Sequence, residues 1–168
     1  MHNLREIDIN KSEFNPFEKI GNDWMLITAG NENSFNTMTA SWGGLGVLWN
    51  KNVAFLFIRP SRYTHEFTEN EDFFSLCFFP EEYRKALTFC GKYSGRDCDK
   101  VKETGLSPIF IDGVPCFEEA SLIIVCKKVY TQEMDQNCTD CPEVKSHYAE
   151  DEPYHTMYIG EIVKVLSK

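Results

Sequence analysis

Short apolar runs separated by polar turns dominate the chain, and they predict a mainly β protein with a few short helices. The runs expected to form strands span residues 24–29, 36–42, 53–58, 73–79, 120–131 and 154–166. Residues 43–46, Gly-Gly-Leu-Gly, are expected to form a turn. No linker divides the sequence, so these strands predict one domain over residues 1–168, folded as a closed or nearly closed barrel.

Helical spacing is confined to short segments. Residues 81–90 place apolar side chains at helical intervals, and residues 63–70 form a second candidate. A further short helix is expected over residues 97–104, with Asp97 as its N-cap. The polar stretch 132–153 lacks clear periodicity and is expected to be a surface lid or a dimer-crossing loop.

The charge balance limits the partners of this protein. Its 26 acidic residues outnumber 17 basic ones, giving a formal net charge of −9. Such a surface repels nucleic acids and anionic membranes. An anionic ligand must therefore be held by a local group of arginine, hydroxyl and backbone N–H donors.

Other features of the sequence predict a cytoplasmic location. The first 11 residues carry charges and lack the apolar run of a secretory signal. The seven cysteines are spread through apparent strands and a loop without a compact disulfide framework, which is typical of a reducing compartment.

One expected strand is rich in hydroxyl and small side chains. Its candidate binding residues are Asn36, Thr37, Met38, Thr39, Ala40, Ser41 and Trp42. Small side chains let a flat ring lie against the backbone, whose polar groups then bond to the edge of the ring. The alternative is an ordinary barrel strand with threonines on its solvent face.

Two local clusters combine basic and hydroxyl side chains with the start of an expected helix. The first contains Arg59, Ser61, Arg62, Tyr63 and Thr64. It suits a phosphate cradle, because a helix N-terminus supplies free N–H groups. The alternative is a solvated turn in which Thr64 caps the helix. The second cluster joins Ser94 and Arg96 to Asp97 and Lys100 and could close over the same phosphate, although helix capping by Asp97 explains part of it.

The cysteines carry weaker signals. Cys138 and Cys141 form a C-x-x-C pair near His147, but a structural zinc site needs a second ligand pair at comparable spacing. We therefore predict no metal site and expect surface cysteines, with a redox role left open. Cys90 fits the buried face of its helix.

Five sequence runs, in order, carry a resemblance to a known family. They read NTMTASWGG, IRPSRYTHEF, FFPEEYRKAL, SGRDCDKVKETGLSP and YHTMYIGEI. Together they resemble the flavin-reductase-like FMN-binding family, closest to its flavoredoxin branch. The resemblance implies an antiparallel, Greek-key split β-barrel that forms a homodimer with FMN at the subunit interface.

The resemblance also implies roles for the candidate residues. Asn36 to Trp42 would line the isoalloxazine ring, whereas Arg59, Ser61, Arg62, Tyr63 and Thr64 would hold the ribityl phosphate, with Ser94 and Arg96 as further contacts. His155 precedes a Gly-Glu pair, where the reductases of this family contact the nicotinamide. The alternative for His155 is a purely structural place in the dimer interface.

The expected function is an FMN-dependent oxidoreductase that takes hydride from NADH or NADPH and passes electrons to flavin or another small acceptor. One alternative is a flavoredoxin-type electron carrier that exchanges electrons with a redox partner protein and handles no nicotinamide. Another is a flavin-binding or haem-binding barrel without turnover. A shared fold does not choose among these functions.

Overall fold

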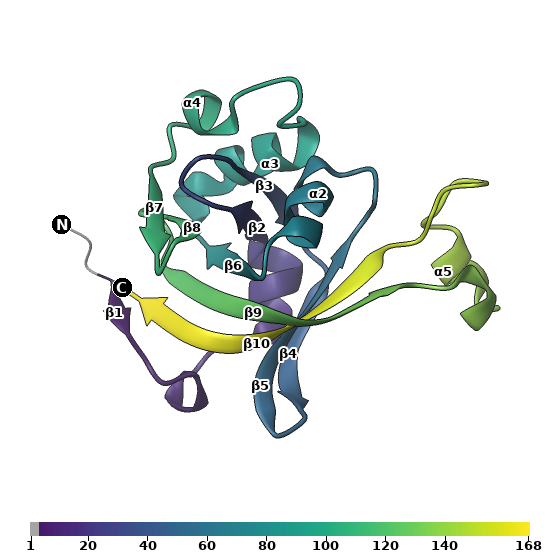
Figure 1. Ribbon diagram of the computed structural model, residues 1–168, viewed down its shortest axis with the longest axis horizontal. Helices are drawn as coiled ribbons and strands as arrows, with labels where there is room; N and C mark the ends of the chain where they lie inside the picture. The colour runs from purple at the N-terminus through teal and green to yellow at the C-terminus, as the bar shows by residue number, and fades with distance from the viewer. Residues whose placement is uncertain (1–3) are drawn as a thin grey trace.

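One antiparallel sheet organises the chain in the computed structural model, which describes residues 4–168 (Figure 1). Its strands pair in the order β3-β2-β6-β9-β10-β5-β4, and β1 pairs with β10. The strands of this sheet are β1 (Arg5–Glu6), β2 (Met25–Gly30), β3 (Phe35–Ala40), β4 (Gly43–Leu48), β5 (Lys51–Ile58), β6 (Phe73–Phe78), β9 (Leu122–Glu133) and β10 (Thr156–Ser167). A separate two-stranded ribbon pairs β7 (Pro108–Ile111) with β8 (Val114–Phe117).

The sheet is open, so the expectation of a closed barrel is wrong. Within residues 4–168, pairing begins at β3 and ends at β4, and no pairing joins these two strands. Helix α3 (Arg84–Lys92) packs against β3 instead, with Thr39 donating its hydroxyl hydrogen to the Leu87 carbonyl oxygen. A covered edge no longer needs a strand partner, which is one of the ways proteins protect sheet edges.

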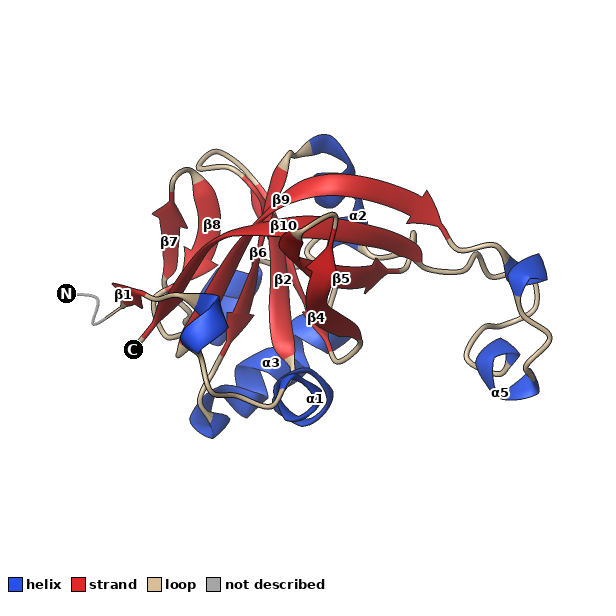
Figure 2. Cartoon of the chain, turned by 90° about the horizontal axis from the view of Figure 1, so that it is seen from below, coloured by secondary structure: helices blue, strands red, loops and turns tan. Residues whose placement is uncertain are grey.

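Helices lie on both sides of the sheet (Figure 2). They are η1 (Ile9–Lys11), α1 (Pro16–Glu18), η2 (Lys19–Asp23), α2 (Tyr63–Asn70), η3 (Glu81–Tyr83), α3, α4 (Lys100–Thr104), η4 (Gln136–Cys138) and α5 (Pro142–Lys145). The predicted helix 63–70 matches α2, and the predicted helix 81–90 corresponds to η3 and α3. Asp97 is not a cap, because α4 begins at Lys100 and Asp99 accepts a bond from the Lys102 N–H at 3.1 Å.

The predicted glycine turn at residues 43–46 is also wrong. These residues open β4, which pairs in regular register with β5 from Gly43 opposite Leu56 to Leu48 opposite Lys51. Glycine is required at position 43, where φ is +154° and an added Cβ would lie 2.8 Å from the Phe55 carbonyl oxygen. The actual turn is Trp49–Asn50, with φ values of 53° and 56°. Two left-handed residues are what a tight hairpin turn needs.

The two faces of the sheet bury separate apolar clusters. Met25 and Ile27 of β2 point to one cluster, whereas Leu26 between them points to the other. This alternation follows from the two-residue period of a strand. The second cluster lies under α3 and includes Cys90, which confirms that this cysteine packs in the core.

Residues 134–155, called the arm below, leave the sheet between β9 and β10 and project from it (Figure 1). The predicted loop 132–153 is therefore partly wrong. Strand β9 continues to Glu133, and the arm contains η4 and α5. No helix formed by residues 4–168 is both long enough and apolar enough to cross a membrane.

Candidate functional site

A cavity of about 380 Å³, called the outer cavity below, opens beside the end of β3. Strand β3 and the two residues after it form one wall, the end of β5 and its following turn form another, and His155 contributes from the base of the arm. The lining residues are Met38, Thr39, Ala40, Ser41, Trp42, Phe57, Arg59, Ser61, Arg62 and His155.

A second, smaller cavity of about 90 Å³, called the inner cavity below, shares Met38, Ser61 and Arg62 with the outer one. It lies against the start of α2, where the first N–H groups of a helix lack partners within the helix. The lining residues are Asn36, Met38, Ser61, Arg62, Tyr63, Thr64, Lys92, Tyr93, Ser94 and Lys100. The volume exceeds the ~10–15 Å³ that one water molecule needs, and it suits a small polyatomic anion.

The lining of the inner cavity is cationic. Arg62, Lys92 and Lys100 contribute positive charges, most of the other side chains carry hydroxyl groups, and none of the lining residues is an acid. This contrasts with the net charge of −9 for the whole chain. Cations and hydroxyl donors beside a helix N-terminus are the groups that bind phosphate.

Neighbouring segments hold this cavity in shape. The Asn36 side-chain amide donates to the Thr64 hydroxyl at 2.8 Å, which ties β3 to α2. Thr64 is fully buried and does not cap the helix, since Arg62 occupies the N-cap position. Gly95 presses against Asn36, and a Cβ at this position would lie 2.0 Å from the Asn36 Oδ1. Only glycine allows this close approach.

The arm holds Arg59 at the outer cavity. Its Nη1 donates to Glu152 Oε1 at 2.6 Å, and its Nη2 donates to the His147 carbonyl oxygen at 2.8 Å. The guanidinium also lies 5.3 Å from the centre of the Tyr148 ring. The sequence groups Arg59 with Thr64, but the structure separates them, because Arg59 lines only the outer cavity and Thr64 only the inner one.

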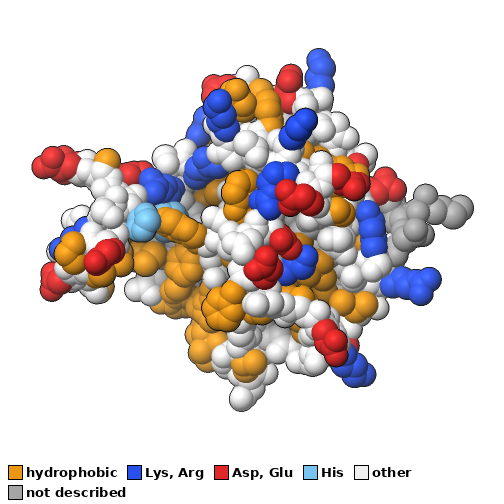
Figure 3. Space-filling model, turned by 180° about the vertical axis from the view of Figure 1, so that it is seen from behind, with side chains coloured by type: hydrophobic (Ala, Val, Ile, Leu, Met, Phe, Trp, Pro, Cys, Tyr) orange, Lys and Arg blue, Asp and Glu red, His pale blue; other side chains and the backbone are white. Residues whose placement is uncertain are grey.

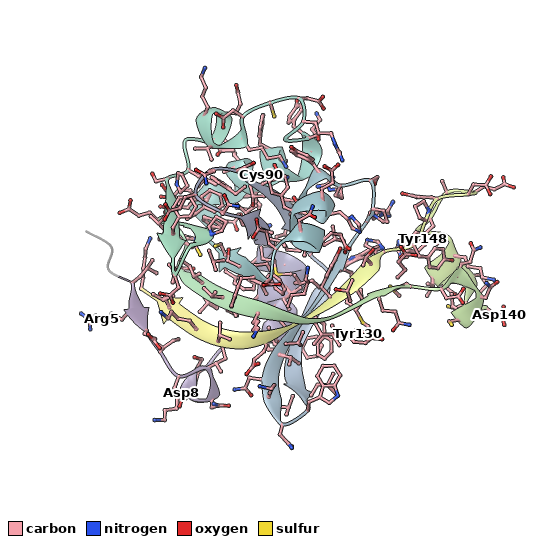
Figure 4. The ribbon with its side chains drawn as sticks, viewed as in Figure 1. Arg5, Asp8, Cys90, Tyr130, Asp140 and Tyr148 are labelled. Carbon is pink, nitrogen blue, oxygen red and sulfur yellow. The ribbon has the colours of Figure 1, made fainter. Side chains whose placement is uncertain are left out.

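His155 lies between the arm and the outer cavity. It is 6% exposed, and its ring centre lies 5.3 Å from that of Trp42. Its Nδ1 is 2.6 Å from the Tyr148 hydroxyl. Tyr148 lies where the arm joins the sheet, and Asp140 lies farther out on the arm (Figure 4).

The Tyr148 hydroxyl determines which nitrogen of His155 carries the proton. A phenol is a stronger acid than a neutral imidazole, so we assign Tyr148 as the donor and Nδ1 as the acceptor. The proton of the neutral ring then sits on Nε2, which forms no hydrogen bond with residues 4–168. Burial, and secondly the Arg59 guanidinium, lower the pKa of His155 from 6.5 to about 4. The imidazole is therefore uncharged near neutral pH.

Two of the predicted site residues lie outside both cavities. The Thr37 hydroxyl is buried against β2, where it bonds to the Thr28 hydroxyl and the Ile27 carbonyl oxygen. Arg96 forms an ion pair with Glu66 and lies over the Tyr63 ring at 4.7 Å. Arg96 therefore supports the start of α2 from outside the two cavities.

A model of the flavin reductase like domain matches residues 17–168. The chain belongs to the flavin reductase like family. A search of curated proteins returns no significant match.

Solved structures share this fold. An FMN-binding domain of a flavin reductase-like enzyme from Shewanella baltica matches with a TM-score of 0.71 and 16% identity, over 99% of this chain and 78% of that one. Flavoredoxin from Methanosarcina acetivorans matches with a TM-score of 0.69 and 22% identity, over 98% and 76%. An NADH:FAD oxidoreductase from Streptomyces globisporus matches with a TM-score of 0.64 and 14% identity, over 87% and 75%.

For this member of the flavin reductase like family, sequence reasoning missed several lining residues. Phe57 lines the outer cavity, and Lys92 and Tyr93 line the inner one, where Lys100 of the second predicted cluster also lies. Phe57 precedes the basic turn in the sequence and gives no polar signal. Lys92 and Tyr93 directly precede Ser94 in the sequence. A second lysine beside the cluster of Ser94 and Arg96 was therefore the signal that could have found them.

The cysteine pair Cys138 and Cys141 lies on the arm, exposed and free. The Cys141 thiol contacts the Glu143 carboxylate at 3.0 Å. In the part of the chain that the structure describes, no group of three or more metal-binding side chains comes together.

The shifted pKa of His155 predicts a measurable pH dependence. An NMR titration of the histidine ring signals should show His155 staying neutral until about pH 4, with the His155→Ala spectrum assigning its peak. The unfolded chain, with a pKa near 6.5, takes up this proton first as the pH falls. The contribution of His155 to stability is therefore complete above pH 6.5 and is lost as the pH falls towards 4. A midpoint near 6.5 in the folded protein would contradict this environment.

Proposed function

We propose that this chain binds FMN and works as an oxidoreductase that takes hydride from NADH or NADPH. The flavin ring would lie in the outer cavity and the terminal phosphate in the inner cavity. The cationic, acid-free lining of the inner cavity carries the proposal, since a chain of net charge −9 keeps three positive side chains there. A phosphomonoester carries the negative charge that would balance these cations.

The outer cavity suits a flat ring. Residues 38–41 along β3 bring mostly small side chains to its wall, and Trp42 and Phe57 supply aromatic surface. Bound flavin supplies hydride acceptance and the transfer of one or two electrons. The protein's tasks are then to orient the ring, exclude water and fix the neighbouring donors.

His155 would assist the approach of the nicotinamide. Its neutral ring presents Nε2–H at the outer cavity, because Tyr148 occupies Nδ1. A neutral donor can bond to an amide or hydroxyl oxygen of the nucleotide without adding charge beside Arg59. This position agrees with the role that the family resemblance implies for His155.

A second candidate function is electron transfer with a redox partner protein, as in flavoredoxin. Trp42, on the wall of the outer cavity, is 44% exposed. An accessible aromatic edge allows a protein surface to come close to a bound flavin. Reduction by nicotinamide distinguishes the two functions.

We also propose that two copies of the chain pair as the split-barrel homodimer of the family. Exposed apolar side chains gather on the β4–β5 hairpin and the neighbouring end of β9, with Val47 at 72%, Trp49 at 55% and Tyr130 at 39% exposed. Figure 3 shows an apolar surface next to the projecting arm. Extended patches of this kind mark interaction surfaces.

FMN should be the flavin recovered from the purified protein. The inner cavity, at about 90 Å³, has room for one phosphate group, and the sequence lacks the G-x-G-x-x-G turn that binds the pyrophosphate of a dinucleotide. Mass spectrometry of the heat-released cofactor measures this directly. Recovery of mainly FAD would overturn the assignment.

Anaerobic addition of NADH or NADPH should bleach the bound flavin. His155→Ala should slow this reduction at least about fivefold, a cost near 1 kcal/mol that is typical of one lost hydrogen bond, with FMN content unchanged. His155→Gln, which keeps an N–H donor, should recover part of the rate. Equal rates in the parent and His155→Ala would remove His155 from the mechanism. No reduction in any protein would favour the electron carrier.

Light scattering should give about twice the 19.4 kDa of one chain for the flavin-bound protein. Trp49→Glu should shift the population towards monomer, because it places a charge in the apolar patch. A flavin-bound monomer in the parent protein would contradict the dimer.

A further inference from the structure

A third cavity, of about 360 Å³ and called the apolar cavity below, adjoins the outer cavity. Helices α1 and η2, the residues after β3 and the start of β4 surround it. Ser41 and Trp42 line both cavities, so the proposed flavin ring would lie next to this space. The lining residues are Pro16, Phe17, Ile20, Gly21, Ser41, Trp42, Gly43, Gly44 and Leu45.

None of these lining residues is charged, although charged residues make up 26% of the chain. Apart from the Ser41 hydroxyl and the Trp42 indole N–H, their side chains have no hydrogen-bonding group. A charged ligand would lose its water shell there without compensation. The lining therefore favours an uncharged, mostly apolar ligand over a nucleotide.

The helices beside the apolar cavity keep their charged groups off its wall. Lys19 donates to the Asp23 carboxylate at 2.7 Å, and Glu18 accepts from the Asn22 side-chain amide at 2.8 Å. These four residues do not line the cavity, whereas their neighbours in the same segment do. The segment therefore presents its uncharged side to the cavity.

Two aromatic side chains on this wall are open to solvent. Phe17 is 86% exposed, and Trp42 also has an accessible edge. Covering such rings with another flat ring removes apolar surface from water and adds ring–ring contact. The volume lies in the range of small-molecule sites. Val47 and Trp49 of the patch proposed for the dimer do not line this cavity, which favours a small ligand over a second copy of the chain.

We propose that the apolar cavity binds the electron acceptor, and that this acceptor is an uncharged aromatic quinone and not a free flavin nucleotide. The proposal rests on the proposed function and deepens it by naming the class of the second substrate. Trp42 stands on the wall shared with the outer cavity, so a quinone in the apolar cavity would lie beside the bound flavin.

The electrons and protons of this reaction balance without a further co-reactant. Reduction of a quinone to its hydroquinone takes two electrons and two protons. The hydride of NADH or NADPH brings two electrons and one proton to the bound flavin, and solvent brings the second proton. All of them pass to the quinone, which leaves the flavin oxidised and the nicotinamide as its oxidised form.

The probes for the test are menadione, a neutral two-ring quinone, and a sulfonated naphthoquinone, which adds a negative charge to the same frame. Equilibrium dialysis against the oxidised, FMN-loaded protein measures their binding. Anaerobic stopped-flow mixing with protein that dithionite has reduced measures electron transfer without nicotinamide.

Two variants change the apolar cavity in different ways. Gly21→Leu fills it, and a Cβ at Gly21 would meet no heavy atom within 4 Å, so the backbone need not move. Phe17→Lys places a positive charge on the wall at an exposed position. Val163→Lys is the matched control, because Val163 is 46% exposed and lines none of the three cavities.

The parent should bind menadione at least about tenfold more tightly than the sulfonated probe. Gly21→Leu should weaken menadione binding and slow flavin oxidation by menadione, each at least about tenfold. Phe17→Lys should narrow the preference for the neutral probe, because its charge attracts the sulfonate. Val163→Lys should match the parent.

Equal menadione binding in the parent and Gly21→Leu would overturn the proposal, as would a parent that prefers the sulfonated probe. A parent that binds no menadione, with Gly21→Leu shifted from dimer to monomer, would overturn it by making the cavity an interface between copies. FMN content and reduction by NADH are measured on the same samples. A parent without FMN would refute the proposed function, and dialysis of menadione against the flavin-free parent and Gly21→Leu would still decide whether the cavity binds a quinone.

Discussion

The site depends on positive charge held inside an acidic protein without acidic neighbours. Arg62 and Lys100 are tied by three backbone carbonyl oxygens from two segments, Thr37 of β3 and the neighbouring Cys90 and Gly91 of α3. Carbonyl oxygens orient the two cations and leave their charge uncompensated. The same bonds position β3, the end of α3 and the start of α4 around one small space. The requirement to neutralise this charge therefore connects the fold to the proposed binding of a phosphate.

The arm applies a second constraint, at the outer cavity. The Glu152 carboxylate and the His147 carbonyl oxygen accept hydrogen bonds from the Arg59 guanidinium, and the Tyr148 hydroxyl bonds to one ring nitrogen of His155. These contacts hold Arg59 at the outer cavity and leave His155 with a single donor facing that cavity, while burial, and secondly the Arg59 charge, lower the pKa of His155 and keep its ring neutral. The cationic inner cavity, the proposed phosphate site, thus differs from the neighbouring wall of the outer cavity, which is aromatic and mostly uncharged.

Local chemistry explains why much of the site was predictable from the sequence. Ser61, Arg62, Tyr63 and Thr64 are consecutive at a helix start, so their proximity needs no knowledge of the fold. The division of Arg59 from Thr64 was not predictable, because it depends on a contact with Glu152, 93 residues away. The clustering of Lys100 with Ser94 and Arg96 was predicted, but its carbonyl partner was not, since Thr37 lies 63 residues earlier.

The fold, like the site, was predictable only where local sequence decides the structure. The apolar runs located the main strands, because a strand with one buried face alternates apolar and polar side chains over a few neighbouring residues. The glycines at 43–46 indicated a turn, but pairing with β5 made them part of a strand. Whether the sheet would close depended on pairing between β3 and β4, a tertiary contact that no local pattern reports.

A crystal structure of the protein grown with FMN is the most direct test of this account. The account predicts the phosphorus atom inside the inner cavity, within hydrogen-bonding reach of Ser61, Arg62 and Lys100, and the ring against residues 38–42. A phosphate bound to Arg59 at the arm, or a flavin ring outside the outer cavity, would contradict it.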